Sequence, residues 1–594
     1  MTYIASDYAG GFLYSMDRWA WRQTEQMPGS IAREVMRQRA ELVGRTDTTS
    51  TSPFSLANRF LMEQHRKLLA GRIWSAYDEG LIRDCAESWA RAASVIPQLT
   101  AREEFARFHG IGPPSRKHLT DRYEECAARL ADPVWWRRQI RKAWTRASEG
   151  AVRELGVVRK GKMPYASDDA VAFRAQMKRN ARGFQENAVL ANELGEQLSL
   201  FDVAQTSISN PALRRGEFMT RVRGFEELAE FRKDIALFFT LTTPSRFHCQ
   251  RAEGGKNPQF YVEETPQKKR ETVRSAQAWL CKQWAKARAA LHRRDITIYG
   301  FRIAEPHHDG TPHWHGLFFM SPDTADVVSD VITRTWLKDS PHEPGARAHR
   351  VRIEKIDPSR GSAAGYIAKY IAKNIDGHGA IGVAGDHETG AAVSAGVARV
   401  DAWAAVHGIR QFQQIGGPPV GLWREARRLR EEVDDVDIER VRRCADRGDW
   451  RGFCRSVASP TEVGTRHTSI KLWKEETGER TRYGGCRPAR TLGLRCSSVT
   501  VQTRPHRWEI RKKGQAGQEA DVVIPSGSHL GESGSGPSLE SSLPLGPVAI
   551  TVRPSWKLIP GTRRLIRGRW VQMTMPGQPG APVFIFVDPH QALM

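Results

Sequence analysis

The chain has 594 residues, 40% of them hydrophobic and 26% charged, which is too long for one compact core, so two to four domains are expected. Its 90 Lys and Arg against 67 Asp and Glu give a net charge of +23, which favours a polyanionic partner, above all nucleic acid. The sequence shows no membrane-spanning run, no secretory signal and no CxxC pair among its eight cysteines, so we expect a cytoplasmic protein without membrane contact, disulfide framework or zinc ribbon.

Residues 1–215 are expected to form a helical N-terminal region. The segments Arg66–Ala93 and Trp135–Arg146 place apolar residues at helical spacing, with basic residues between them. The tryptophans are expected to pack in a core rather than to stack on bases. The arginines could contact phosphate, although a solvated helix face is the ordinary interpretation.

Residues 216–430 change in character and predict a catalytic domain built on a sheet. Strands alternate with helices there, which predicts an α+β fold, a central antiparallel sheet with helices on one face. The Asp309–Gly310 turn is expected to join two of the strands into a hairpin. The expected strands are 236–242, 296–304, 313–320 and 349–356, and the expected helices are 268–293, 327–336 and 362–374.

The rest of the chain is expected to contain less regular structure. A glycine-rich stretch at 377–396 is expected to be a mobile loop, and residues 397–450 return to helix. We expect a C-terminal extension at 431–513, a Gly/Ser/Pro-rich linker at 514–547 and a small β-rich tail at 548–594. The tail has β-like runs at 548–552, 569–575 and 583–587.

A candidate metal site lies around the predicted hairpin. His313 and His315 alternate along a strand, so they project from one face about 7 Å apart. The hairpin would return Glu305 beside them as a third ligand, with His307 as a fallback. Two imidazoles and a carboxylate leave positions open for catalysis, suit Mg²⁺ or Mn²⁺, and make zinc plausible. The competing interpretation is a structural or exposed His-x-His pair.

The second candidate site is a pair of tyrosines on the predicted helix 362–374. Tyr366 and Tyr370 are four residues apart and share one helical face, with Lys369 close to it. A nearby ammonium and a metal-bound phosphate would lower the cost of the phenolate. Its attack on DNA would leave a 5′-phosphotyrosine and a free 3′-hydroxyl, and a second tyrosine would allow a second cleavage. Tyrosines at this spacing also commonly pack in a core, which is the competing interpretation.

Three blocks resemble the HUH endonucleases and, within them, the bacteriophage replication gene A proteins: Phe238–His248, Glu305–His315 and Tyr366–Asn374. The likeness spans at least residues 231–430. It implies a rolling-circle initiator that nicks a phage replication origin on double-stranded DNA. It also implies metal binding by His313, His315 and Glu305, alternating nucleophiles at Tyr366 and Tyr370, and Lys369 in support.

Three alternatives remain open. A two-tyrosine HUH transposase shares the same chemistry. A plasmid relaxase fits less well, because its tyrosine usually precedes the histidine motif. A non-catalytic origin-binding protein would need no tyrosine pair. The sequence shows no Walker-type loop, so we expect a separate host helicase and the host replisome as partners, besides single- and double-stranded DNA.

Overall fold

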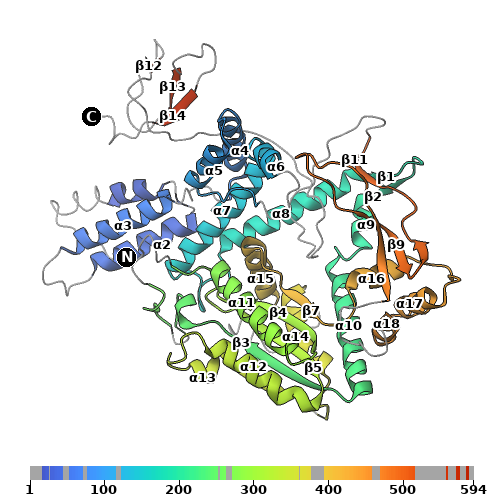
Figure 1. Cartoon of the computed structure of the whole chain (residues 1–594). Coiled ribbons are helices and arrows are strands. Elements are labelled where there is room, and N and C mark those ends of the chain that lie inside the picture. The colour runs from blue at the N-terminus through green and yellow to red at the C-terminus, as the bar shows by residue number, and fades with distance from the viewer. Residues whose placement is uncertain are drawn as a thin grey trace.

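The computed structural model describes most of the chain, and all structural statements concern that part. Helices and antiparallel sheets both occur in it, which confirms the α+β class. Figure 1 shows the N-terminal helices beside a sheet covered by helices, with C-terminal strands reaching back to β1. The described residues are 17–25, 27, 29–44, 52–70, 77–115, 122–251, 254–261, 270–359, 361–375, 393–457, 469–514, 557–558, 570–574 and 583–586.

The N-terminal region is helical, as predicted, up to Glu186. Its longest helix starts where Asp132 caps the first turn and Pro133 takes the N1 position. Trp89, Trp136 and Trp144 pack together in a buried core, which confirms their structural role. The helices are α2 (Gly29–Val43), α3 (Pro53–Ala70), α4 (Glu79–Ser94), α5 (Leu99–Phe108), α6 (Arg122–Leu130), α7 (Pro133–Glu154) and α8 (Asp168–Glu186).

The predicted continuous helix at Arg66–Ala93 is wrong. α3 ends at Ala70, and α4 begins only at Glu79. Asp78 has extended backbone angles, and its side chain accepts a hydrogen bond from the Leu81 amide, so it caps α4. A capping aspartate starts a helix rather than continuing one, and this signal outweighs the apolar spacing around it.

The centre of the fold is a five-stranded antiparallel sheet with the strand order β6-β3-β5-β4-β7. The predicted hairpin is β4 and β5, and its register places Glu305 opposite His313. Gly310 closes the turn with a φ of +80°, which favours glycine. The strands are β3 (Ile235–Leu241), β4 (Tyr299–Pro306), β5 (Pro312–Met320), β6 (Val351–Lys355) and β7 (Phe412–Ile415).

Helices cover both faces of this sheet, so the expected coverage of one face is wrong. One face packs Phe239, Trp314 and Phe318 against α11 (Val273–His292), α12 (Ala325–Leu337) and α15 (Val393–His407). The other face packs Phe238 and Leu317 against α10 (Pro211–Arg232) and α14 (Ala363–Ile375), with α16 (Val420–Ala426), α17 (Val436–Asp446) and α18 (Trp450–Val457) beyond them. Successive side chains of a strand point to opposite faces, so β3 and β5 supply both cores.

The C-terminal extension contains strands that the sequence did not predict. β8 (Ile470–Glu475), β9 (Arg490–Cys496) and β10 (Val499–Gln502) form one sheet. β11 (Glu509–Lys512) instead pairs with β1 (Ala188–Ala191), which also pairs with β2 (Gln197–Ser199). The extension therefore joins the end of the N-terminal region (Figure 1). Short elements complete the fold: α9 (Leu200–Gln205), α13 (Ala346–His349) and the 3₁₀ turns Ser245–Phe247 and Pro322–Thr324.

Other predictions meet different outcomes. Residues 397–450 are not wholly helical, because β7 interrupts them. Strands β13 (Trp570–Thr574) and β14 (Val583–Phe586) match two predicted runs of the tail and pair with each other, and β12 (Lys557–Leu558) adds to them. The loop at 377–396 lies mainly outside the described residues. The linker at 514–547 lies outside them except for Gly514, and the run 548–552 lies wholly outside them. Among the described helices, none has the length and apolar character that crossing a membrane requires.

Candidate functional site

The hairpin gathers three side chains that could hold a metal ion. One donor atom each from Glu305, His313 and His315 lies within 4.8 Å of the other two, and all three residues are buried. The Nε2 atoms of the two histidines are 3.0 Å apart. Two ligands at right angles on an ion, each about 2.1 Å from it, are about 3.0 Å apart. The donor set therefore fits a divalent ion.

The carboxylate of the triad is held from α14. Asn374 donates from its side-chain amide to Glu305 and to the Tyr370 carbonyl, the latter at 2.6 Å. Gln411 donates to the Asn374 oxygen at 2.8 Å, which fixes the orientation of that amide. On the other side, the Thr240 hydroxyl lies 3.2 Å from Nδ1 of His315. These contacts direct the carboxylate and one imidazole toward the same point.

Both predicted tyrosines lie on the sheet face that carries the triad. The Tyr370 ring is centred 4.3 Å from the His315 ring. The Phe238 ring of β3 contacts both phenol rings: its centre lies 4.7 Å from that of Tyr366 and 5.3 Å from that of Tyr370. The i and i+4 spacing therefore places both rings on one face of α14, with Tyr370 beside His315 and Tyr366 one turn away against Phe238.

The Tyr366 hydroxyl has a carboxylate partner that the sequence did not reveal. It donates a hydrogen bond to Glu354 of β6. Glu354 also forms an ion pair with Arg352 at 2.7 Å. Burial, together with the adjacent carboxylate, raises the pKa of Tyr366 to about 12. The resting side chain is therefore a neutral phenol whose proton points at an acceptor.

The start of α14 is fixed by two acceptors. The Ser362 hydroxyl accepts from the Gly365 amide at 2.9 Å, and Glu226 of α10 accepts from the Ala363 amide. A carboxylate at this end also complements the helix dipole. Lys369 lies on α14, but its side chain is outside the described part of the structure, so its supporting role stays a prediction.

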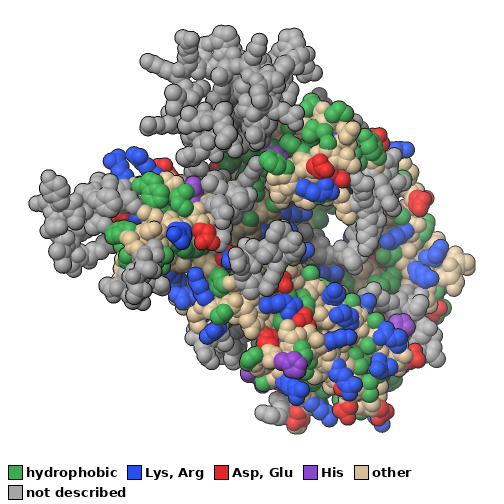
Figure 2. Space-filling model, turned by 60° about the vertical axis from the view of Figure 1, so that its left-hand side comes forward, with side chains coloured by type: hydrophobic (Ala, Val, Ile, Leu, Met, Phe, Trp, Pro, Cys, Tyr) green, Lys and Arg blue, Asp and Glu red, His purple; other side chains and the backbone are tan. Residues whose placement is uncertain are grey.

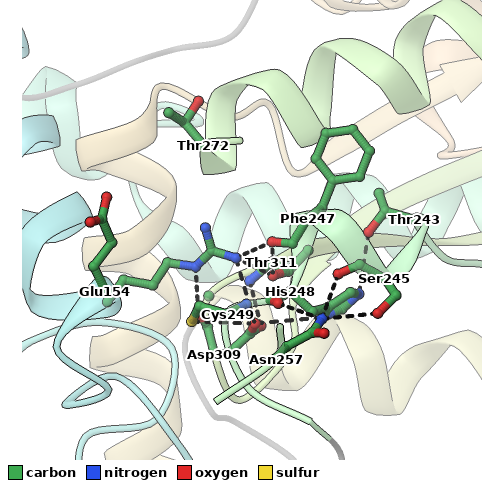
Figure 3. Close-up of polar contacts among 12 residues, drawn as sticks. Glu154, Thr243, Ser245, Phe247, His248, Cys249, Asn257, Thr272, Asp309 and Thr311 are labelled. Atoms are coloured by element: carbon green, nitrogen blue, oxygen red, sulfur yellow. Dashed lines mark hydrogen bonds and ion pairs between the residues drawn. The ribbon is translucent and has the colours of Figure 1, made fainter. Parts of the chain in front are cut away.

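A buried polar network braces the turn of the hairpin. Asp309 accepts from the Cys249 and Thr311 amides, each at 3.0 Å, and lies 3.6 Å from His248 (Figure 3). Arg153 of α7 donates to the Asp309 carbonyl at 2.9 Å and the Thr311 hydroxyl at 2.6 Å. Burial alone would raise the pKa of Asp309, but His248 and Arg153 hold it well below its usual value. α7 thus directly supports the hairpin that carries the candidate metal ligands.

His307, the fallback ligand, is not in the donor cluster. Its ring stacks on His313, with ring centres 4.0 Å apart, and meets His248 at 5.1 Å. The cluster found among the described residues consists of the other three side chains. The geometry assigns His307 a packing contact with the ligand ring.

The sequence-based prediction of site residues did not include Glu354, Asn374 and Gln411. Each reaches the site through packing of separate elements: Glu354 on β6 meets Tyr366 from 12 residues away, Asn374 is 69 residues from Glu305, and Gln411 is 37 residues from Asn374. The one available signal was position, because Asn374 follows Tyr370 by one helical turn and therefore shares its face.

Comparison with known proteins identifies a family of phage replication proteins. The family description "Bacteriophage replication gene A protein" matches residues 81–378. The "Replication gene A protein" of Escherichia phage 186 is 34% identical over 429 residues, 69% of this chain and 60% of that protein. The "Replication protein" of Haemophilus phage HP1 is 36% identical over 392 residues, 65% and 49% of the two chains.

A further relative carries a name that refers to a prophage-like region. The "Probable replication endonuclease from prophage-like region" of Escherichia coli O6:H1 is 37% identical over 410 residues, 66% of this chain and 50% of that protein. The chain thus spans about half to three fifths of the length of these relatives. No solved structure matches it. On the match to residues 81–378, about half of its length, the chain belongs to the bacteriophage replication gene A protein family.

Proposed function

We propose that the chain nicks one DNA strand at a phage replication origin by tyrosine transesterification and so initiates rolling-circle replication. The observation that carries the proposal is the Tyr370 ring 4.3 Å from His315 of the donor triad, with Tyr366 one turn away. Names of relatives that include "replication" and "endonuclease" support it. They also favour an initiator over a two-tyrosine transposase.

In the proposed reaction, a phenolic oxygen attacks the backbone phosphorus. An oxygen–phosphorus bond forms to tyrosine, the bond from phosphorus to the 3′-oxygen breaks, and that oxygen takes a proton from solvent. For Tyr366, the phenolic proton passes to Glu354, which already accepts it as a hydrogen bond, and for Tyr370 it passes to solvent. The products are a 5′-phosphotyrosine and a free 3′-hydroxyl. The second tyrosine remains available for a second transfer.

We propose that Glu305, His313 and His315 hold Mg²⁺ or Mn²⁺. The chemistry that a divalent ion supplies is polarisation of a phosphate oxygen. The residues themselves contribute a buried, preoriented set of ligands, in which Asn374 keeps Glu305 turned toward the histidines. Zinc is compatible with the same donors. Removing the metal with a chelator and then adding back each ion separately identifies the ion that restores nicking.

The test uses the intact chain and supercoiled plasmid carrying its coding region and flanking DNA. With Mg²⁺ or Mn²⁺, the expected product is an open circle with protein attached to the 5′ end, and mass spectrometry should find the phosphate on Tyr366 or Tyr370. The joint Tyr366→Phe and Tyr370→Phe variant should form no adduct yet bind DNA. Tyr123→Phe, at an exposed tyrosine, serves as the control.

Two outcomes would overturn the proposal. Retarded but intact circles would favour the alternative of another class, a non-catalytic origin-binding protein. Full activity of the double variant would refute the tyrosine assignment. We further propose that unwinding depends on a separate host helicase, and ATP hydrolysis by the pure chain would contradict that.

A further inference from the structure

Basic side chains are spread over much of the visible surface, with acidic ones between them (Figure 2). Surface charge alone therefore does not single out a place for DNA. A more specific feature lies where α7 and α11 meet the end of α15. Arg138, Lys142 and Arg146 follow one another at i, i+4 and i+8 on α7, so they form one stripe. Arg274, in the first turn of α11, joins this stripe.

Two members of this cluster bind carbonyl groups at the end of α15 and of the residue that follows it. Arg146 donates to the Val406 carbonyl at 3.0 Å. Arg274 donates to the His407 and Gly408 carbonyls at 3.2 and 3.1 Å. These contacts hold both guanidinium groups in place. A helix C-terminus offers a partial charge of only about half an electron, so it cannot neutralise the cluster.

The cluster carries a surplus of positive charge. Lys142, Arg146 and Arg274 form no ion pair with any acidic side chain of the described residues. Burial, and then the charges of Arg138, Arg146, Arg141 and Arg274, lower the pKa of Lys142. His407 adds no charge, because burial and the neighbouring arginines lower its pKa to about 3. By contrast, Arg141 of the same helix is paired with Glu79 at 2.6 Å.

The cluster lies beside the end of the sheet that carries the donor triad, on the side covered by α11 and α15, opposite the face of the tyrosines. Arg274 binds the Gly408 carbonyl, and three residues later Gln411 donates to Asn374, which holds Glu305. Three residues of extended chain span at most about 11 Å. Gln411 also accepts from the Ala304 amide at 2.7 Å, next to Glu305. The cluster and the triad therefore lie at the same end of the sheet.

We propose that Lys142, Arg146 and Arg274 form a seat for backbone phosphates of the DNA strand that enters the donor triad. This inference rests on the proposed function. Like charges gathered without acidic partners disfavour the folded state, and an anion relieves that repulsion. A strand held there contributes two or more phosphates, and its continuation around this end of the sheet leads toward the metal ligands. The seat recognises the backbone and carries no base specificity.

The test measures the salt dependence of binding to a labelled single-stranded oligonucleotide, with EDTA present to prevent cleavage. Each phosphate contact contributes about 0.7 to the slope of log K against log salt for single strands. Lys142→Gln should reduce the slope by about that amount and weaken binding several-fold, whereas Lys142→Arg should keep both. The matched control is Lys471→Gln, which removes one charge from an exposed lysine of β8 and should change neither.

Thermal unfolding separates binding from a structural role. Because Lys142 is repelled by its neighbours, Lys142→Gln should leave Tm unchanged or raise it while DNA affinity falls. A lower Tm with an unchanged slope would overturn the seat, as would equal slopes for Lys142→Gln and Lys471→Gln. Covalent adducts from the unaltered chain are scored separately. If the unaltered chain forms adducts but Lys142→Gln does not change the slope, the phosphate-seat proposal is contradicted and the nicking proposal stands. If Lys142→Gln reduces the slope but the unaltered chain forms no adducts, the nicking proposal is contradicted and the phosphate-seat proposal stands.

Discussion

At the scale of single residues, the two tyrosines are chemically unequal. The Tyr366 hydroxyl donates to Glu354, whereas Tyr370 lies against the His315 ring. Since the carboxylate contributes to the raised pKa of Tyr366, Glu354→Gln should move that pKa from about 12 down toward the ordinary value near 10. Ultraviolet difference spectra between each protein and its Tyr366→Phe counterpart should report the shift; an unchanged titration would disprove the coupling.

The same pair has a consequence for stability at high pH. The folded pKa of Tyr366 lies above its ordinary value, so the contribution of the neutral phenol to stability is complete below about pH 10. It is lost as the pH rises toward about 12.

A second prediction follows for the rate of nicking. We expect Glu354 to accept a proton from Tyr366 and not from Tyr370. In the Tyr370→Phe background, where Tyr366 is the remaining nucleophile, Glu354→Gln should therefore slow adduct formation by about 10²-fold or more. In the Tyr366→Phe background, where Tyr370 is the remaining nucleophile, the same change should have little effect on the rate of adduct formation. Single-turnover adduct yields in the Tyr370→Phe and Tyr366→Phe backgrounds check this. Equal slowing in both backgrounds would assign Glu354 a structural role.

Asn374 provides a third test. Asn374→Leu removes the amide that holds Glu305 in place, so affinity for Mn²⁺ should fall about 10- to 100-fold, the usual loss when such a supporting residue is removed. Titration calorimetry of the chelator-treated chain measures it. Gln38→Leu, at another side-chain amide that bonds a carboxylate far from the site, serves as the control. Unchanged Mn²⁺ affinity in Asn374→Leu would show that Glu305 needs no support.

At the scale of elements, features that depend on local sequence patterns were predicted, whereas features that depend on long-range contacts were not. The alternation His313-Trp314-His315 gave the correct strand face, and the Tyr366–Tyr370 spacing gave the correct helix face, because both depend only on backbone geometry. The partners Glu354 and Asn374 depend on how β6 and α14 pack, which no local pattern encodes. Helices on both faces could have been predicted, since residues 236–239 form an uninterrupted apolar run, which is typical of a strand buried on both faces. β7 was missed because it is short and has two glutamines at its centre.

The β4–β5 hairpin depends on Arg153 of α7, which gives a fourth prediction. Arg153→Met leaves the buried Asp309 without its guanidinium partner, so it should cost about 3–5 kcal/mol of unfolding free energy. Adding Asp309→Asn should recover part of that loss, because the two residues are coupled. Chemical denaturation followed by tryptophan fluorescence measures both. The exposed Arg334→Met, which loses only an i,i+4 pair, should cause no measurable loss, and strict additivity would contradict the coupling.

At the scale of the whole molecule, the extension beyond α18 closes the fold onto its N-terminal half. β11 pairs with β1 across more than 300 residues of sequence. Glu425 of α16 is buried and receives a two-pronged ion pair from Arg504, at 2.9 and 2.7 Å. Ile470 and Leu494 complete the core beneath α16 and α17. The extension is therefore part of the packed structure around the sheet.

This arrangement predicts different outcomes for two shortened chains. A chain ending at Gly514 keeps β8–β11 and should retain the Tm of the full chain. A chain ending at Val457 loses one of the two partner strands of β1, the two-pronged ion pair of Arg504 with Glu425 and part of the core, so the buried carboxylate keeps only its weaker pair with Arg428. Its Tm should fall by several degrees, and limited proteolysis should cut near β1 (Ala188–Ala191). Equal Tm values for the two chains would mean that the extension only rests on the surface, and DNA binding measured in both would then locate its contribution elsewhere.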